Sequence, residues 1–201
     1  MKNRWEERYK NKDLPWDTGR VETNLAKTIE ANNIDGKKVL EVGCGTGTNA
    51  LWLEEQGFTV TALDISDEAI NKAQSKANES DSSIRFLVMD ILRNIPDDKP
   101  FDFAFDRGVF HSFDSSKERK LFSLQIAQSL NTDALWLSLI GSCDSPPRET
   151  GPPMRSAQDI VLAVEEYFEI IELRASFFDS KRPDPAKSWY ALMKKRKMQP
   201  S

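Results

Sequence analysis

The chain of 201 residues is poor in the side chains that build metal centres and disulfide frameworks, with two cysteines and one histidine. Cys44 and Cys143 are too few for either framework, so each is expected to be a reduced thiol, and we expect no metal. No apolar run reaches membrane-spanning length, and the first residues lack the apolar core of a signal peptide. These absences predict a cytoplasmic protein without a membrane partner.

An excess of positive charge is also missing. Lysine and arginine number 28 against 32 acidic residues, which gives a formal net charge of −4 and a pI near 5.2. This balance argues against a nucleic-acid partner. The hydrophobic share of 39% is enough for one core, and there is no internal repeat or linker, so we expect a single domain over 1–201.

What the chain does contain is an apolar run that breaks into alternating glycines. The glycines are Gly43, Gly45 and Gly47. Glycine adopts positive φ and lets the backbone approach a ligand closely. Glu41 precedes them at the end of the run, where its carboxylate can reach a polar or cationic group of a ligand. Asp64 closes a second apolar run, at the place where the ribose hydroxyls of NAD or S-adenosylmethionine are held. Together these residues predict a nucleotide-like cofactor.

Strand and helix patterns alternate along most of the chain. Apolar runs typical of buried parallel strands lie at 39–42, 58–63, 84–89, 101–105 and 134–140. Helix patterns lie at 21–32, 48–56, 67–79, 116–130 and 157–167. Two further strand patterns, 168–178 and 187–193, are joined by a loop too short for a crossover helix, so they should pair antiparallel. The prediction is an α/β, Rossmann-like doubly wound sheet of mostly parallel strands ending in an antiparallel C-terminal hairpin.

Several polar residues follow the predicted strands. Asp90 follows the third, Asp106 the fourth, and the loop Ser142–Arg155 the fifth. Ligands of open α/β sheets bind outside the carboxyl ends of the strands, so we expect these residues to line one crevice. Aspartate is also common in caps and turns, which is the alternative for Asp106. Asp90 with Ile91 could accept from an exocyclic amine and cover one face of a purine.

At this point the chain resembles a known family. EVGCGTG, LDISDEAI, MDI and FDRGVF resemble the successive cofactor motifs of class I S-adenosylmethionine-dependent methyltransferases. WEERYKNKDLPWDTGR, FDRG, GPPM and KSWYALM resemble the thiopurine and thiol/halide methyltransferases, over nearly the whole chain. The resemblance implies the class I methyltransferase fold, S-adenosylmethionine as cofactor and a small-molecule methyl acceptor, a thiol or another soft nucleophile.

The resemblance also implies roles for individual residues. The loop of Gly43, Cys44 and Gly45 would hold the methionine part of the cofactor. Asp64 and Ile65 would hold the ribose and adenine, and Asp90 and Ile91 the adenine. Trp5, Trp16 and Arg107 match positions that close over cofactor and acceptor. Met154 replaces an aromatic residue that relatives often carry.

The N-terminal segment, residues 1–20, combines strong charge with large aromatics. Trp5, Tyr9 and Trp16 lie within it. They either dock the segment on the core or form a lid whose aromatic faces meet a sulfonium, an attraction of about 0.5–2 kcal/mol. We expect a lid.

Arg107 and His111 are the candidate catalytic residues. Arg107 could contact an anionic or aromatic acceptor, or be a salt-bridged loop arginine. His111 could act as general base, or be a packed histidine; the thiopurine and halide enzymes lack a histidine at this place. A thiol, partly ionised at neutral pH, needs no base, whereas an oxygen or nitrogen acceptor would depend on His111.

Two other classes of protein compete with this interpretation. A nicotinamide-dependent oxidoreductase would use a similar glycine turn, and Tyr190 and Lys194 have the spacing of one dehydrogenase group. That pair needs a helix, whereas the residues around it follow a strand pattern. A non-catalytic cofactor-binding protein is the second alternative. The chain lacks the Asn/Asp-Pro-Pro-Tyr run of enzymes that methylate nucleic-acid bases, and its sequence does not predict an oligomeric state.

Overall fold

The computed structural model describes residues 2–32, 34, 37–146 and 151–197. Its helices are α1 (Lys2–Lys10), α2 (Thr23–Asn32), α3 (Thr48–Glu55), α4 (Asp67–Glu79), α5 (Ser116–Ser129) and α6 (Ala157–Val164), with a short 3-10 turn η1 (Phe110–Ser112). Its strands are β1 (Lys38–Val42), β2 (Thr59–Asp64), β3 (Arg85–Val88), β4 (Phe101–Arg107), β5 (Leu130–Gly141), β6 (Phe168–Phe177) and β7 (Lys187–Lys195).

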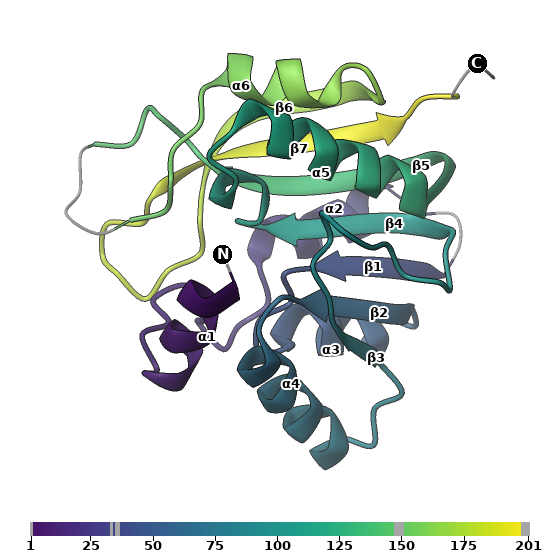
Figure 1. The fold of residues 1–201 in the computed structure, drawn as a ribbon, viewed down its shortest axis with the longest axis vertical. Coiled ribbons are helices and arrows are strands. Elements are labelled where there is room, and N and C mark those ends of the chain that lie inside the picture. Colours follow the sequence, from purple (N-terminus) through teal and green to yellow (C-terminus); the bar gives the residue numbers. More distant parts are fainter. Residues whose placement is uncertain (1, 33, 35–36, 147–150, 198–201) are drawn as a thin grey trace.

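The strands described form one sheet in the order β3-β2-β1-β4-β5-β7-β6. The pairs β1–β2, β1–β4, β2–β3 and β4–β5 are parallel. Strand β7 is antiparallel to both β5 and β6. The predicted sheet of mostly parallel strands with an antiparallel C-terminal hairpin is confirmed (Figure 1).

Alternating side chains of the strands face two separate helical layers. On one face Trp136, Phe110 and Phe122 pack with residues of α5 and α6. On the other, Phe103 and Phe105 pack with residues of α2, α3 and α4. Burial on both faces explains why the strands appear in the sequence as continuous apolar runs, as is typical of a doubly wound sheet.

The predicted boundaries differ most at β5, which begins at Leu130 instead of residue 134. Leu130 is the C-cap of α5 and already has extended backbone angles, so the strand follows the helix without a loop. The pair Tyr190 and Lys194 lies on β7, where the Tyr190 hydroxyl bonds Thr28 at 2.8 Å and Lys194 pairs with Glu169. The dehydrogenase arrangement of that pair is absent.

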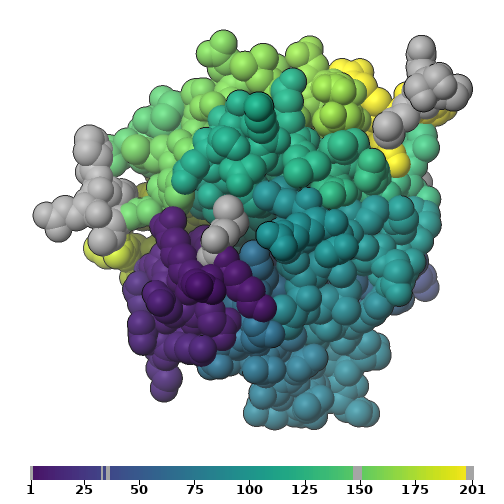
Figure 2. Space-filling model, viewed as in Figure 1, coloured from purple at the N-terminus to yellow at the C-terminus, as the bar shows by residue number. Residues whose placement is uncertain are grey.

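Helix α1 lies beyond the edge of the sheet toward which the parallel strands run (Figure 1). In the space-filling view the N-terminal segment, coloured purple, lies against the surface of α4 (Figure 2). This edge, where the loops after the parallel strands meet the N-terminal segment, holds the site described next.

Candidate functional site

The turn between β1 and α3 is built from the three alternating glycines. Gly43, Gly45 and Gly47 have φ of +70°, +57° and +80°, which side chains other than glycine rarely adopt. A Cβ on Gly43 would lie 2.2 Å from Val109, and one on Gly45 would lie 2.9 Å from the Tyr9 hydroxyl. The turn therefore requires glycine for its backbone shape and for its close contacts.

Two carboxylates flank this turn, and burial raises the pKa of both. Asp64 accepts from the backbone N–H of Gly45 at 3.1 Å and of Ser66 at 3.0 Å, and its pKa is raised to about 6. Glu41 is 2% exposed, and its pKa is raised to about 8. Its Oε1 accepts from Asn49, whereas its Oε2 has no partner among the described residues. A buried acceptor without a donor is costly unless a ligand supplies the donor.

A cavity of about 640 Å³ opens between the glycine turn, the N-terminal segment and the loops after β4, β5 and β6. Its two halves follow from the order of the strands. The glycine half is formed by residues at and after the ends of β1, β2 and β3, namely Glu41–Thr46, Asp64, Ile65, Asp90 and Ile91. The histidine half is formed by Glu22 and by residues at and after the ends of β4, β5 and β6, namely Arg107–Phe113 without Phe110, Gly151–Pro153, Phe178–Ser180, Arg182 and Ala186.

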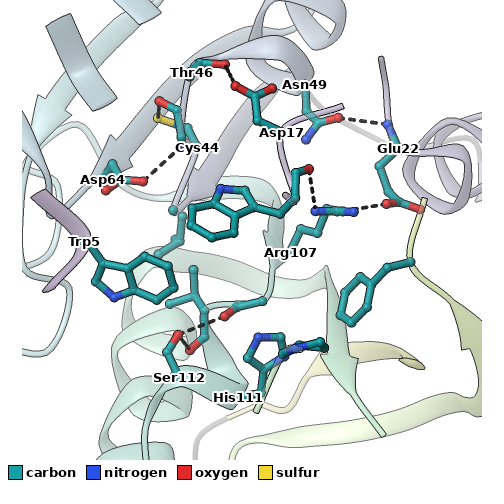
Figure 3. A pocket seen from close by; sticks show the side chains of 18 of the residues that line it. Trp5, Asp17, Glu22, Cys44, Thr46, Asn49, Asp64, Arg107, His111 and Ser112 are labelled. Atoms are coloured by element: carbon teal, nitrogen blue, oxygen red, sulfur yellow. Dashed lines mark hydrogen bonds and ion pairs between the residues drawn. The ribbon is translucent and has the colours of Figure 1, made fainter. Parts of the chain in front are cut away.

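Most of the predicted site residues lie in the wall of this cavity. In the glycine half these are Glu41, Gly43, Cys44, Gly45, Asp64, Ile65, Asp90 and Ile91. Trp5 and Trp16 line it from the N-terminal segment, and Arg107 and His111 from the histidine half. Figure 3 shows Asp64 and Cys44 on the opposite side of the cavity from His111. The loop Ser142–Arg155 contributes Gly151–Pro153, its residues 147–150 lie outside the described residues, and Met154 is exposed outside the wall.

Asp106 does not line the cavity, so its predicted place in the crevice is wrong. It is 0% exposed, and its carboxylate accepts from the backbone N–H groups of Val109 and Phe110 and from Trp136 Nε1. Burial raises its pKa to about 6. Asp106 therefore fixes the turn after β4 to the core, which is the cap-and-turn role that aspartate often has.

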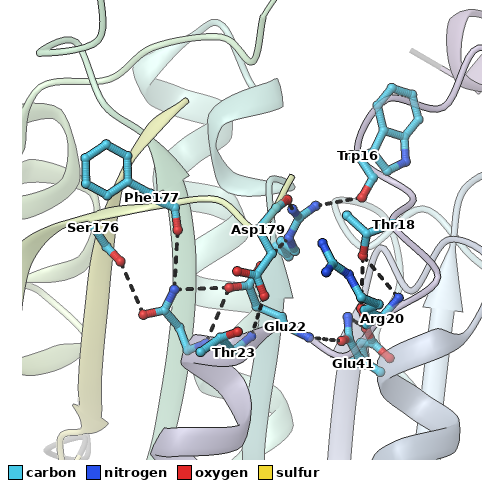
Figure 4. A network of polar contacts seen from close by, with 12 residues as sticks. Trp16, Thr18, Arg20, Glu22, Thr23, Glu41, Ser176, Phe177 and Asp179 are labelled. Atoms are coloured by element: carbon cyan, nitrogen blue, oxygen red, sulfur yellow. Dashed lines mark hydrogen bonds and ion pairs between the residues drawn. The ribbon is translucent and has the colours of Figure 1, made fainter. Parts of the chain in front are cut away.

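Arg107, the last residue of β4, uses its guanidinium group to connect three segments. Its Nε donates to the buried Glu22 at 2.7 Å (Figure 3). One terminal nitrogen donates to the Trp16 carbonyl at 3.2 Å and the other to the Asp179 carbonyl at 2.7 Å. Figure 4 shows the three partners, Glu22, Trp16 and Asp179, in one network of polar contacts. Its guanidinium carbon lies 5.1 Å from the ring centroid of Phe178. Arg107 is therefore the salt-bridged arginine of the second alternative, and its guanidinium group still lies in the cavity wall.

His111 is buried in η1, at 6% exposure. Its Nδ1 accepts from the Gly141 backbone N–H at 2.7 Å. Burial, with smaller contributions from Arg155 and Arg107, lowers its pKa to about 3. Because Nδ1 is occupied as an acceptor, the neutral ring carries its proton on Nε2. The nitrogen left for a ligand is then a donor, which opposes the general-base interpretation.

The N-terminal segment is docked on α4 and the glycine turn. Glu6 accepts from the Ser66 hydroxyl at 2.7 Å and from the Glu68 backbone N–H at 3.3 Å, and the Ser66 hydrogen bond lowers its pKa. Trp5 and Trp16 meet edge to face at 5.4 Å, and Arg8 lies 4.2 Å from the ring centroid of Trp16. One face of Trp16 is therefore covered by a cation of the protein itself.

Several cavity residues were not predicted from the sequence, among them Glu22, Phe178 and Asp179. Because β6 runs parallel to β5, residues after β6 reach the same edge as those after the other parallel strands. The rule that located Asp90 would have found Phe178 and Asp179 had it been applied to β6. Glu22 carried no signal, since its partner Arg107 is far away in the sequence.

Within the described residues, no group of histidine, cysteine and acidic side chains could hold a metal ion. A search of the same residues finds no helix long and apolar enough to cross a membrane.

A family model, curated relatives and solved structures are similar to this chain. The family model for thiopurine S-methyltransferase matches residues 1–188. A 2-heptyl-1-hydroxyquinolin-4(1H)-one methyltransferase of Mycobacteroides abscessus is 29% identical over 161 residues, which cover 79% of this chain and 70% of the relative. Probable thiol methyltransferase 2 of Arabidopsis thaliana is 26% identical over 169 residues, covering 83% and 70%. A solved S-adenosylmethionine-dependent methyltransferase of Methanosarcina mazei has the same fold, with a TM-score of 0.71 at 20% identity, covering 81% of this chain and 93% of that one.

Proposed function

The chain belongs to the thiopurine S-methyltransferase family and is an S-adenosylmethionine-dependent methyltransferase, and from this premise we propose that its acceptor is a thiol on a small, largely aromatic molecule. Two names among the relatives support this class of acceptor, a probable thiol methyltransferase and a thiocyanate methyltransferase. The net charge of −4 supports a small molecule over a nucleic acid. The reduced state expected of the two cysteines supports a cytoplasmic location.

One observation carries the proposal. Each candidate base described in the histidine half already forms a hydrogen bond or an ion pair with another group of the protein. His111 has Nδ1 occupied by Gly141. Among the carboxylates described there, Glu22 is bound to Arg107, and Asp179 accepts from the Thr23 backbone N–H at 2.7 Å. The surrounding wall is apolar, with Phe113, Phe178 and two prolines. An acceptor that enters this half has to arrive ionised or ionise readily.

A thiol meets this condition. With a reference pKa near 8.5, a few per cent is thiolate at neutral pH. S-adenosylmethionine supplies, when bound, a methyl group already activated on a sulfonium. The remaining task of the chain is to orient the two reactants in line and to exclude water. The charge of Arg107 in the cavity wall favours an anionic acceptor, although its nitrogens are engaged by the protein.

The glycine half fits the cofactor. The orphaned Oε2 of Glu41 can accept from the ammonium of the methionine part, and the turn from Gly43 to Gly45 leaves room for a close approach of the backbone. The carboxylate of Asp64 has about four lone pairs, and its two backbone donors use only two of them. The others can accept from ribose hydroxyls. We assign the ribose to Asp64 and Ile65 and the adenine to Asp90 and Ile91. Cys44, Trp5 and Trp16 complete the wall.

The N-terminal segment, residues 1–20, is assigned as a lid on a single methyltransferase domain. Its contacts with Ser66 and Glu68 lie next to Asp64, and its Asp17 accepts from the Thr46 hydroxyl at 2.9 Å. The lid is therefore held by the same turns that surround the cofactor half. Opening it would expose the cavity, and closing it would exclude water from the reacting atoms.

A turnover screen with S-adenosylmethionine carrying a labelled methyl group tests the proposal. The panel contains alkyl and aromatic thiols, thiocyanate, halides and phenols. Thiols should be the best acceptors. Turnover of phenols alone would contradict the proposal.

A second candidate is a hydroxyl acceptor on a heteroaromatic ring. It is favoured by the relative named as a 2-heptyl-1-hydroxyquinolin-4(1H)-one methyltransferase, at 29% identity. An N-hydroxyquinolone belongs in the same screen, and its preference over thiols would select this alternative.

A further inference from the structure

The imidazole of His111 is held by a backbone group that cannot turn away. Gly141 ends β5, where it pairs with Ser188 of β7, and its carbonyl accepts from the Arg155 N–H at 2.8 Å. Its own N–H points at His111 Nδ1, at 2.7 Å. An amide N–H only donates, so Nδ1 has to accept, and the proton of the neutral ring resides on Nε2.

The Nε2 of this ring is free for a ligand. His111 lines the cavity, and no described residue accepts a hydrogen bond from Nε2. Phe178 meets the imidazole edge to face, with ring centroids 5.8 Å apart. A Cβ on Gly108 would lie 3.1 Å from Nε2, so the glycine leaves this side of the ring uncrowded. The donor is thus fixed in position and lies in the histidine half (Figure 3).

Burial keeps the imidazole of His111 neutral, and the charged groups around it add to this effect. Arg155 and Arg107 both oppose a positive charge on the imidazole. The nearby carboxylate of Asp106 accepts from Val109, Phe110 and Trp136. Protonation of Nδ1 would also place its new N–H against the N–H of Gly141, and the hydrogen bond between the two residues would be lost.

We propose that His111 is a specificity-determining hydrogen-bond donor, whose Nε2–H binds a lone pair on the acceptor molecule beside the atom that is methylated. The recognised group is a ring nitrogen, a carbonyl oxygen or an oxyanion. The inference rests on the proposed function, in that the histidine half holds the acceptor. It assigns His111 the task of selecting and orienting the acceptor, without taking up its proton.

Nuclear magnetic resonance tests the tautomer directly, because the chain has a single histidine. In protein labelled with ¹⁵N, the ring spectrum should show a proton on Nε2 and a bare Nδ1. The spectrum should stay unchanged between pH 5 and pH 9, because the lowered pKa of His111 keeps its ring neutral over this whole range. A proton on Nδ1, or titration near the reference pKa of about 6.5, would overturn the inference.

Two variants of His111 distinguish the role of the donor Nε2 from that of the acceptor Nδ1. His111→Asn keeps an oxygen that can accept from Gly141 but removes the donor at Nε2. His111→Gln places an N–H near the position of Nε2. With methyl 2-mercaptobenzoate, whose ester carbonyl lies beside the sulfur, His111→Asn should raise KM roughly tenfold with little change in kcat. His111→Gln should recover part of that loss.

Thiophenol, which lacks the ester carbonyl, is the matched control acceptor. Its KM should rise much less in His111→Asn than the KM of methyl 2-mercaptobenzoate does. Affinity for S-adenosylhomocysteine, measured by calorimetry, should be unchanged in both variants and so report an intact fold. An equal rise of KM for both thiols, or none for either, would overturn the role of His111.

Failure of the proposed function leaves a different pattern. If the wild type methylates only an oxygen acceptor, the thiol proposal fails. The ratio of KM between His111→Asn and wild type, measured on that oxygen acceptor, then decides the role of His111 in the same way.

Discussion

Glu41 and Asp64 bring two carboxylates into a region of the protein from which water is largely excluded. Burial is the first cause of the raised pKa of each, to about 8 for Glu41 and about 6 for Asp64. Both side chains weaken the fold when they are ionised and have no ligand. We propose that a bound cofactor, which supplies donors and positive charge, stabilises their ionised forms.

The first prediction concerns Glu41 and the stability of the protein without cofactor. The folded chain holds a proton on Glu41 up to about pH 8, whereas the unfolded chain releases it near pH 4.3. The free energy of unfolding should therefore fall as pH rises between these values. Glu41→Gln should remove the Glu41 part of this decline, leaving the smaller parts of Asp64 and Asp106, and be more stable than wild type at pH 9 by about 2 kcal/mol or more.

Denaturant unfolding at pH 5 and pH 9 measures this effect. Glu55→Gln, at an exposed position of α3, is the control and should leave the pH dependence unchanged. The same Glu41→Gln variant should bind S-adenosylmethionine more weakly. A variant that loses stability at pH 9 would show that Glu41 has a partner in the folded protein.

The second prediction concerns Asp64 and the ribose. Ribose hydroxyls donate best to an ionised carboxylate, so affinity for S-adenosylhomocysteine should fall as pH drops through about 6. Asp64→Asn should weaken binding by about 1.5–3 kcal/mol and abolish this pH dependence. Calorimetry from pH 5 to pH 8 measures both, with Glu79→Gln at the exposed end of α4 as control. An Asp64→Asn variant with the affinity of wild type would remove Asp64 from the ribose site.

At the scale of elements, the attachment of α1 to the start of α4 connects the proposed lid to the proposed site. Glu6 accepts from the Ser66 hydroxyl, and the backbone N–H of Ser66 donates to Asp64. One short chain of hydrogen bonds thus connects the proposed lid to the proposed ribose site. Arg107 makes a second attachment, through the carbonyl of Trp16.

The third prediction tests this attachment. Glu6→Ala removes the acceptor of two hydrogen bonds, which should cost about 1 kcal/mol and raise the rate of proteolytic nicking in residues 5–20 about fivefold. Glu7→Ala, an exposed neighbour on α1, should have little effect. Addition of S-adenosylhomocysteine should slow nicking in wild type. Equal nicking rates in all four samples would show that this segment does not open as a lid.

The predicted helix starts at residues 67 and 116 are confirmed, and each has a local physical cause. Ser66 accepts from the Ala69 N–H at the start of α4, and Ser115 forms a capping box with Glu118 at the start of α5. Helix α1 was not assigned, because its residues are charged and the contacts that hold it lie on α4. The start of β5 was placed too late, since polar Asn131 and Asp133 interrupt its apolar run.

At the scale of the whole molecule, the parallel strands explain why so much of the site could be predicted. They bring Glu41, Asp64 and Asp90 to one edge of the sheet, and a short rule about strand ends finds all three. The same rule failed for Asp106, because the direction of a side chain at a strand end depends on its neighbours. The pairing of Arg107 with Glu22 and the tautomer of His111 depend on long-range contacts that no local pattern carries.

The central claim, transfer of a methyl group to a thiol without a protein base, is tested most directly by kcat/KM for a matched thiol and hydroxyl acceptor, thiophenol and phenol. An alkyl thiol with a pKa near 8.5 is already ionised about 30 times more than a phenol with a pKa near 10 at neutral pH, and an aromatic thiol such as thiophenol is ionised further. We predict a preference for thiophenol of at least about 30-fold, with a pH profile that follows only the ionisation of the acceptor. Equal or better turnover of phenol, with a limb that disappears in His111→Asn, would contradict the account.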